Sequence, residues 1–326
     1  MLLALSAIIF GLTLLVWSAD KFVEGASSLA SHFGISPLII GITIIGFGTS
    51  APEILVSIIA VLEDTPDIAI GNALGSNIAN IGLILGVTAF ITPIPIAKGL
   101  FRREYPLLVI ATAILAWCMF DGSLDQIDGL TLLLVLVAIL IYLIRSHRND
   151  PNKNRIEQEL SETIPEDMTL KSAIVWVLVG IVILVASSKI LVWGATYVAL
   201  AFGVSELIIG LTVIALGTSL PELAASIASL KKGVPDMAIG NVIGSNLFNS
   251  LAVIGLPALL TNFSIDSHAV SRDLPVVVGL TMLLLCFSCF PASSTQSLSR
   301  AKGFFLLCCF VIYQLYLYYN VMTGST

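Results

Sequence analysis

The stretch GISPLIIGITIIGFGTSAPEILVSII, residues 34 to 59, occurs a second time as GVSELIIGLTVIALGTSLPELAASIA, residues 203 to 228. A second pair follows, because PDIAIGNALGSNIAN at 66–80 matches PDMAIGNVIGSNLFN at 235–249. The offset is 169 residues throughout, and 26 of the 53 positions from Gly34 to Gly86 are identical to their partners. A constant offset over this length indicates an internal duplication.

Both copies lie in a strongly apolar chain. The 326 residues are 57% hydrophobic and 11% charged, with a mean hydropathy of +1.01, whereas a soluble domain is roughly 25% charged. The composition therefore predicts an integral membrane protein. The first apolar segment, LLALSAIIFGLTLLVW, has no basic residue before it and no small-residue cleavage site, so we expect a retained helix rather than a signal peptide.

A membrane-spanning helix needs about 20 predominantly apolar residues. Counted in this way, the sequence predicts ten spans, at 2–18 (or running on toward 30), 37–62, 68–92, 105–120, 126–145, 172–193, 205–230, 237–260, 274–291 and 303–320. The longest polar stretch, 145–171, divides them equally. We predict an N-terminal five-helix repeat at 1–145 with its motif at 34–86, a cytoplasmic linker at 146–171, and a C-terminal repeat at 172–326 with its motif at 203–255.

Five spans per half is an odd number, so the second copy must enter the membrane with inverted topology. When the loops are assigned alternately to two sides, one side collects thirteen Lys and Arg residues and the other only Lys189 and Arg272. The positive-inside rule then places both termini outside the cytoplasm. We expect a multi-pass protein of the plasma (inner) membrane. Inverted repeats are typical of secondary transporters that bind their substrate near the midplane.

The motif GTSAPE, residues 48–53, places a proline and a carboxylate in an apolar segment. Pro52 has no N–H, so the carbonyl of Gly48 loses its helical partner and a helix break is expected. Thr49, Glu53 and Ser57 recur every four residues and share one helix face. Such polar groups are tolerated at membrane depth where they line a cavity.

The copy GTSLPE, residues 217–222, repeats this pattern with Pro221, Thr218 and Glu222. Carbonyls, hydroxyls and carboxylates are the hard oxygen ligands that Ca²⁺, Mg²⁺ and Na⁺ prefer. A single buried Glu could serve a structural hydrogen bond. Two at equivalent positions favour a cation site.

The second motif predicts a polar stripe along one helix face in each copy. Each stripe is accompanied by a GxxxG pair, which lets helix backbones approach closely. Together the stripes and the GTS motifs suggest four helices around an oxygen-lined pocket. The stripes consist of Asn72, Ser76 and Asn80 in the first copy and Asn241, Ser245 and Asn249 in the second.

Two copies of G-T-S-x-P-E and two of G-N-x-x-G-S-N-x-x-N resemble the α-repeats of the calcium/cation antiporter superfamily, which includes the sodium/calcium exchangers and their prokaryotic relatives. The resemblance covers nearly the whole chain. It implies an all-α fold of ten transmembrane helices in two inverted five-helix repeats, with Glu53 and Glu222 binding Ca²⁺ at the centre. It further implies that the calcium and sodium sites are completed by Thr49, Ser50, Ser76, Asn80, Thr218, Ser219, Ser245 and Asn249 and by the carbonyls of Gly46 and Ala215.

The function implied is antiport of Ca²⁺ against Na⁺ by alternating access, with no enzymatic activity, no resident cofactor and no nucleic-acid partner. The ions and the lipid bilayer are the expected partners, and a monomer is the expected state. Some members, including the potassium-dependent branch, carry Asp at the position of Asn249. The absence of Asp at this position argues against potassium co-transport. The alternatives are a proton/calcium antiporter of the same architecture, a passive cation channel and a non-transporting scaffold.

Overall fold

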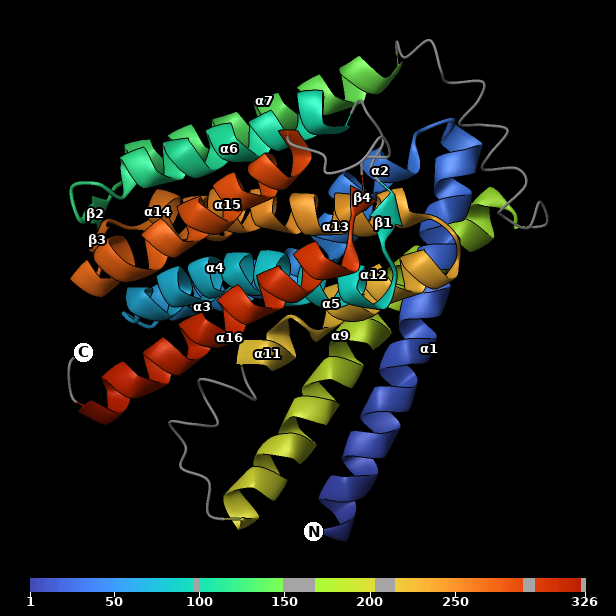
Figure 1. Ribbon diagram of the computed structural model, residues 1–326, viewed down its shortest axis with the longest axis horizontal. Coiled ribbons are helices and arrows are strands. Elements are labelled where there is room, and N and C mark those ends of the chain that lie inside the picture. The colour runs from blue at the N-terminus through green and yellow to red at the C-terminus, as the bar shows by residue number, and fades with distance from the viewer. Residues whose placement is uncertain (96–99, 149–167, 203–214, 290–296, 324–326) are drawn as a thin grey trace.

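The computed structural model describes residues 1–95, 100–148, 168–202, 215–289 and 297–323, and these ranges form helices and short two-residue strands (Figure 1). The first half contains α1 (Leu2–Phe33), α2 (Pro37–Ile40), the π-helical η1 (Gly41–Ile45), α3 (Gly46–Leu62), α4 (Pro66–Ile78), the π-helical η2 (Ala79–Leu85), α5 (Gly86–Ile91), β1 (Ile94–Pro95), α6 (Leu100–Cys118), β2 (Ser123–Leu124) and α7 (Gln126–Arg148). The second half contains α9 (Leu170–Ala201), α11 (Ala215–Thr218), α12 (Leu220–Lys231), α13 (Pro235–Phe248), the π-helical η4 (Asn249–Val253), α14 (Gly255–Leu260), β3 (Phe263–Ser264), the π-helical η5 (Ala269–Asp273), α15 (Leu274–Cys289), β4 (Ser297–Leu298) and α16 (Arg300–Thr323).

Eight helices of the described residues are long and apolar enough to cross a membrane. A ninth predicted span corresponds to α6, whose apolar part, Glu104–Cys118, is shorter. The tenth corresponds to α11 and α12, and its first half falls on residues 203–214, outside the described residues. The first span has the longer of its two predicted extents, since α1 reaches Phe33. The predicted all-α membrane fold is confirmed.

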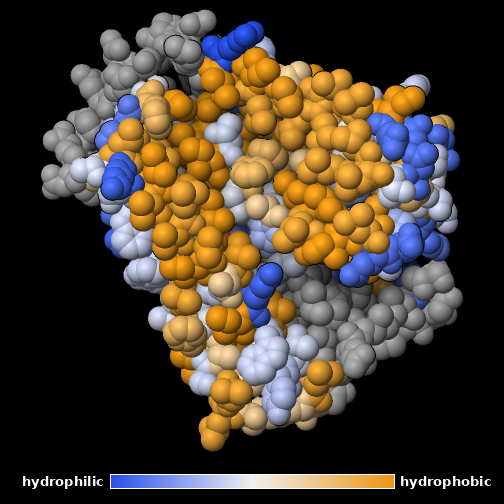
Figure 2. All heavy atoms as spheres, turned by 180° about the vertical axis from the view of Figure 1, so that it is seen from behind, coloured by the Kyte–Doolittle hydropathy of each residue, from blue (hydrophilic) through white to orange (hydrophobic). Residues whose placement is uncertain are grey.

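The surface carries a broad apolar belt. Figure 2 shows hydrophobic residues across the middle of the visible face and hydrophilic residues gathered toward its two ends. Large side chains such as Leu2, Ile9, Trp117 and Leu134 are well exposed. An apolar surface of this extent would aggregate in water and fits the hydrocarbon core of a bilayer.

The two repeats match in their irregular backbone as well as in their helices. The π-helical segments η2 and η4 lie at corresponding positions, and each begins within the last two residues of the second repeated motif. At the corner after α3, Asp64 has a φ of 57°, and its counterpart after α12, Gly233, has a φ of 73°. The amides that follow them bond back in the same way, at 2.8 Å to Ala60 and at 3.0 Å to Ser229. The duplication therefore repeats local geometry.

The short strands link the repeats crosswise. Strand β1 pairs antiparallel with β4, and β2 pairs with β3. These two pairs lie toward opposite ends of the core in Figure 1. Because β1 and β3 occupy equivalent places in their repeats, a parallel duplication would put them at the same end. Their separation is what inverted repeats require.

Helices α1 and α9 cross antiparallel in close contact and project from the remaining helices (Figure 1). Two glycines at equivalent positions, Gly25 and Gly194, make this contact possible. A Cβ at Gly25 would lie 2.9 Å from the carbonyl oxygen of Ala173, and one at Gly194 would lie 2.8 Å from that of Ala4. Small residues are the usual means of bringing membrane helices together.

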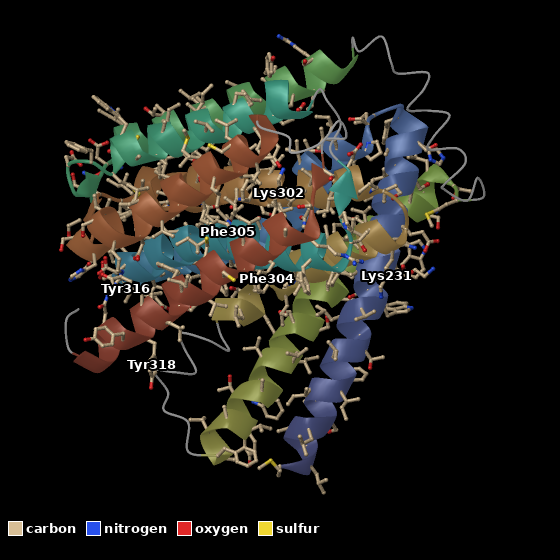
Figure 3. All side chains as sticks on the ribbon, in the orientation of Figure 1. Lys231, Lys302, Phe304, Phe305, Tyr316 and Tyr318 are labelled. Atoms are coloured by element: carbon tan, nitrogen blue, oxygen red, sulfur yellow. The ribbon has the colours of Figure 1, made fainter. Side chains whose placement is uncertain are left out.

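The last helix, α16, has different chemistry at its two ends. Figure 3 places Lys302 near its start and Tyr316 and Tyr318 toward its end. The Lys302 ammonium donates to the carbonyl of Phe287 at 2.9 Å and lies 5.5 Å from the centre of that ring. Exposed tyrosines at a helix end are typical of a membrane interface.

Two of the Lys and Arg residues included in the loop count, Lys21 and Lys189, lie well inside helices α1 and α9. Lys189 already falls within the predicted span 172–193, and Lys21 lies inside α1 because that helix runs on to Phe33. Most of the predicted linker, 149–167, lies outside the described residues.

Candidate functional site

Four helical segments converge where the repeated motifs meet. Helices α3 and α12 carry Glu53 and Glu222, while α4–η2 and α13–η4 carry the polar stripes. Each Glu is only 2% exposed. The two helices that carry these carboxylates, α3 and α12, are in contact with each other. The structure thus brings the two predicted carboxylates together at the junction of the repeats.

An asparagine holds the backbone next to the first carboxylate. The Asn72 side-chain amide donates to the carbonyl of Glu53 at 3.1 Å and to the hydroxyl of Ser57 at 3.0 Å. These contacts join α4 to α3. Since Ser57 is engaged one turn beyond Glu53, its hydroxyl serves to orient Asn72.

The second copy makes the same clamp and adds a link between the repeats. Asn241 donates to the carbonyl of Glu222 at 3.0 Å and to the hydroxyl of Ser226 at 2.9 Å. Its oxygen accepts from the hydroxyl of Thr49 at 3.2 Å, and Thr49 also lies 3.3 Å from the hydroxyl of Ser245. The α3 motif of one repeat is therefore tied to the polar stripe of the other.

Several buried oxygens of the site have no hydrogen-bond partner among the described residues. They belong to Ser50, to both carboxylate oxygens of Glu53, to Oε2 of Glu222, and to the amides of Asn80 and Asn249. A buried polar group without a partner costs about 1–3 kcal/mol. Such groups are rare in folded proteins, and each calls for a physical explanation. Their concentration here fits a site whose oxygens are reserved for cations.

The remaining predicted residues lie on the same segments. Ser76, Ser219 and Ser245 are buried, and Thr218 is partly exposed at the end of α11. Gly46 and Ala215 are the first residues of α3 and α11, and the side chain of Ala215 lies outside the described residues. The Gly46 carbonyl accepts from the Thr49 hydroxyl at 3.5 Å.

The expected helix break is present in one copy only. Helix α11 ends at Thr218 and α12 begins at Leu220, so the backbone turns at Ser219. In the first copy α3 continues through Pro52, and the irregular segment is the preceding η1. The π-helical segment η1 ends at Ile45, seven residues before the proline.

The carbonyl of Gly217, four residues before Pro221, was expected to be free to line a polar cavity, and it forms a hydrogen bond instead. The Gly217 oxygen accepts a hydrogen bond from the hydroxyl of Ser188 on α9 at 2.6 Å. It therefore anchors α9 to α11.

The sequence interpretation did not include three asparagines among the site residues. Asn72 and Asn241 were assigned only to the stripes, and Asn246 was not considered. Asn246 is 1% exposed, and none of its amide atoms has a partner among the described residues. Each of these asparagines has an asparagine at the corresponding position of the other copy, and this repetition is the feature of the sequence that could have identified them.

A cavity of about 420 Å³ leads to the site between α3, α9 and α11. It is lined by Glu53 and Asn72 from the first repeat and by Thr218 from the second, with Ser188 and Lys189 contributed by α9. Glu53 is therefore reached from this cavity. Its mixture of apolar walls and a few convergent polar groups is typical of ligand sites.

The sequence matches the family described as Sodium/calcium exchanger protein, at residues 3–145 and again at 172–319. It is 43% identical over 318 residues to the putative antiporter CaxA of Alkalimonas amylolytica, covering 98% of this chain and 99% of that protein. It is 41% identical over 323 residues to the inner membrane protein YrbG of Escherichia coli K12, covering 98% of each.

The fold is similar to that of the sodium-calcium exchanger NCX_Mj in a structure soaked with Na⁺ and Ca²⁺. The TM-score is 0.80 at 32% identity, and the match covers 96% of this chain and 97% of NCX_Mj.

Proposed function

The chain belongs to the sodium/calcium exchanger family, and on that premise we propose that it exchanges Ca²⁺ for Na⁺ across the membrane by alternating access. It is a cation exchanger of the NCX_Mj architecture and not an enzyme; the choice of Na⁺ as the coupling ion is the proposed step. The observation that carries it is the pair of buried carboxylates, Glu53 and Glu222, with unpartnered oxygens at equivalent points of the two repeats.

The charges explain how one site serves two ions. Two carboxylates carry a charge of −2, which balances one Ca²⁺ or two Na⁺. Ions that compete for the same oxygens cannot occupy them together. An empty anionic site is costly to expose to the membrane interior, so the carrier reorients when loaded and the two fluxes are coupled.

We assign the Ca²⁺ ligands to Glu53 and Glu222, with the hydroxyls of Thr49 and Thr218 and the carbonyls of Gly46 and Ala215. The Na⁺ sites share the carboxylates. Neutral side-chain oxygens complete them, supplied by Ser50, Ser76, Asn80, Ser219, Ser245 and Asn249. The burial of these side chains and the unpartnered oxygens of Ser50, Asn80 and Asn249 support the assignment.

The protein is placed in the cytoplasmic membrane with both termini outside and residues 146–171 in the cytoplasm. The bias of Lys and Arg toward alternate loops supports this orientation. The repeats are assigned to 1–145 and 172–326.

Uptake of ⁴⁵Ca²⁺ into proteoliposomes tests the coupling ion. The purified protein is reconstituted, and outward gradients of Na⁺, H⁺ and K⁺ are imposed one at a time. We expect uptake with the Na⁺ gradient alone. Uptake driven only by the pH gradient would identify a proton/calcium antiporter, and uptake that needs no counter-gradient would identify a channel.

A further inference from the structure

A lysine lies inside the membrane-spanning helix α9. Lys189 is the twentieth of the 32 residues of Leu170–Ala201, about 18 Å from the end of the helix at 1.5 Å per residue. A charged side chain within a membrane-spanning helix is a candidate for a role in an ion or substrate pathway.

Lys189 and Glu53 line the same cavity, together with Thr218. The preceding residue, Ser188, bonds to the Gly217 carbonyl at 2.6 Å, which fixes this part of α9 against α11. The ammonium is therefore carried by a helix segment anchored beside the site.

The charge of Lys189 is not neutralised by a carboxylate within 4 Å among the described residues. The comparable lysine of α1 is paired: Lys21 contacts Glu24 at 2.9 Å and lies 5.6 Å from the ring centre of Trp176. The repeat counterpart of Lys189 is Asp20, which pairs with Lys232 at 2.9 Å. The two repeats thus differ in charge at this position, and only Lys189 lines the cavity.

We propose that Lys189 is a specificity-determining residue, whose fixed positive charge in the access cavity weakens the binding of divalent cations more than that of monovalent cations. The inference rests on the proposed cation site. The electrostatic energy between Lys189 and a bound ion is proportional to the charge of the ion. For ions held by the shared carboxylates at the same distance from the ammonium, the free-energy effect on Ca²⁺ is therefore twice that on one Na⁺.

This proportionality gives a quantitative test. If replacing Lys189 by a neutral residue lowers the half-saturating Na⁺ concentration by a given factor, it lowers that of Ca²⁺ by the square of the factor. A change of about threefold for Na⁺ corresponds to about ninefold for Ca²⁺. Affinities are measured on the full-length protein in detergent, by thermal stabilisation with Ca²⁺ or Na⁺. Choline chloride holds the ionic strength constant.

Three variants make the test specific. Lys189→Gln and Lys189→Met both remove the charge and should give the squared relation. Lys189→Arg keeps the charge and should remain near wild type for both ions. Lys21→Gln removes a charge in α1 that lies outside the cavity and is already paired with Glu24, and it should leave both affinities near wild type.

Equal shifts for the two ions, or none, in both neutral variants would overturn the inference. The binding test of Lys189 and the uptake test of the coupling ion can fail independently of each other. If ⁴⁵Ca²⁺ uptake proves to be driven by protons while binding follows the squared relation, the coupling proposal fails and the role of Lys189 stands. If uptake is Na⁺-driven but the relation is absent, the role of Lys189 fails alone.

Discussion

At the scale of single residues, the site separates groups that are free to bind from groups that hold them. Glu53 and Glu222 present unpartnered oxygens, whereas Asn72 and Asn241 use their amides to fix the backbone behind each carboxylate. The carboxylates could be predicted from the sequence because a charge in an apolar segment is conspicuous. The clamping role of the asparagines could not, since a stripe does not reveal which polar groups face the site and which face a neighbouring backbone.

Neutralising either carboxylate should impair calcium exchange strongly. Glu53→Gln or Glu222→Gln keeps the side-chain shape and removes one charge, leaving a divalent ion undercompensated at membrane depth. We expect at least a tenfold loss of exchange per folded protein, about 1.4 kcal/mol. The double mutant should lose less than the sum, because both residues act on one ion.

The control variants are Ser57→Ala and Ser226→Ala, which lie one turn further along and contact the clamping amides. They should have smaller effects. Exchange near the wild-type level in either Gln variant would contradict the hypothesis that the two carboxylates share one Ca²⁺.

The clamp itself can be tested through Asn241. Asn241→Ala removes the donor to the Glu222 carbonyl and to Ser226 and the acceptor for Thr49. Leaving buried groups unpaired costs about 1–3 kcal/mol each, so both the Tm without ions and the Ca²⁺ affinity should fall. Ser226→Ala removes one of these contacts and should affect both less. A lower Tm with wild-type Ca²⁺ affinity would limit Asn241 to a structural role.

At the scale of helices, the two copies of one motif fold differently. The proline rule predicts a break in both, and the structure has it at Ser219 but not at Pro52. Prolines are tolerated in membrane helices, and α3 continues through Pro52, with the π-helical η1 directly before the start of α3. Sequence shows that a carbonyl loses its partner. Which neighbour then satisfies it, as Ser188 does for Gly217, depends on tertiary packing.

The close contact of α1 and α9 gives a prediction at this scale. In Gly194→Ala the new methyl would lie 2.8 Å from the Ala4 carbonyl oxygen. Because this oxygen belongs to the backbone of α1, the clash is relieved only if α1 and α9 move apart. We expect a lower Tm and slower ⁴⁵Ca²⁺ exchange. Gly279→Ala in α15 is the matched control, because a Cβ added there would meet no described atom of another element within 4 Å. Alanine also favours a helix over glycine by about 0.5–1 kcal/mol. Equal behaviour of the two variants would contradict the role assigned to the contact.

At the scale of the whole molecule, the periodic and repeated features could be predicted and the long-range contacts could not. The duplication, the number of spans and the odd number per half follow from hydropathy and from the 169-residue offset. The ends of α1 and α9 were harder to predict, because the hydropathy of the first span falls at Asp20 and Lys21 while the helix continues to Phe33, and α9 continues beyond the predicted 193 to Ala201. The crosswise pairing of β1 with β4 and of β2 with β3 involves strands of two residues, too short to leave a pattern in the sequence.

The orientation of the molecule is the prediction that joins these observations. The strand pairs place β1 and β4 at one end of the core and β2 and β3 at the other, so an odd number of crossings separates the start of one repeat from the start of the next. The corner after α3 carries Glu63 and its counterpart after α12 carries Lys232, the opposite charges expected for opposite sides of the membrane. An alkaline phosphatase fused after Thr326 should therefore be active, and the same enzyme inserted within 146–171 should be inactive. A green fluorescent protein at the same two positions should give the reverse. Fluorescence after Thr326 together with phosphatase activity in the linker would show that the protein is inserted the other way round.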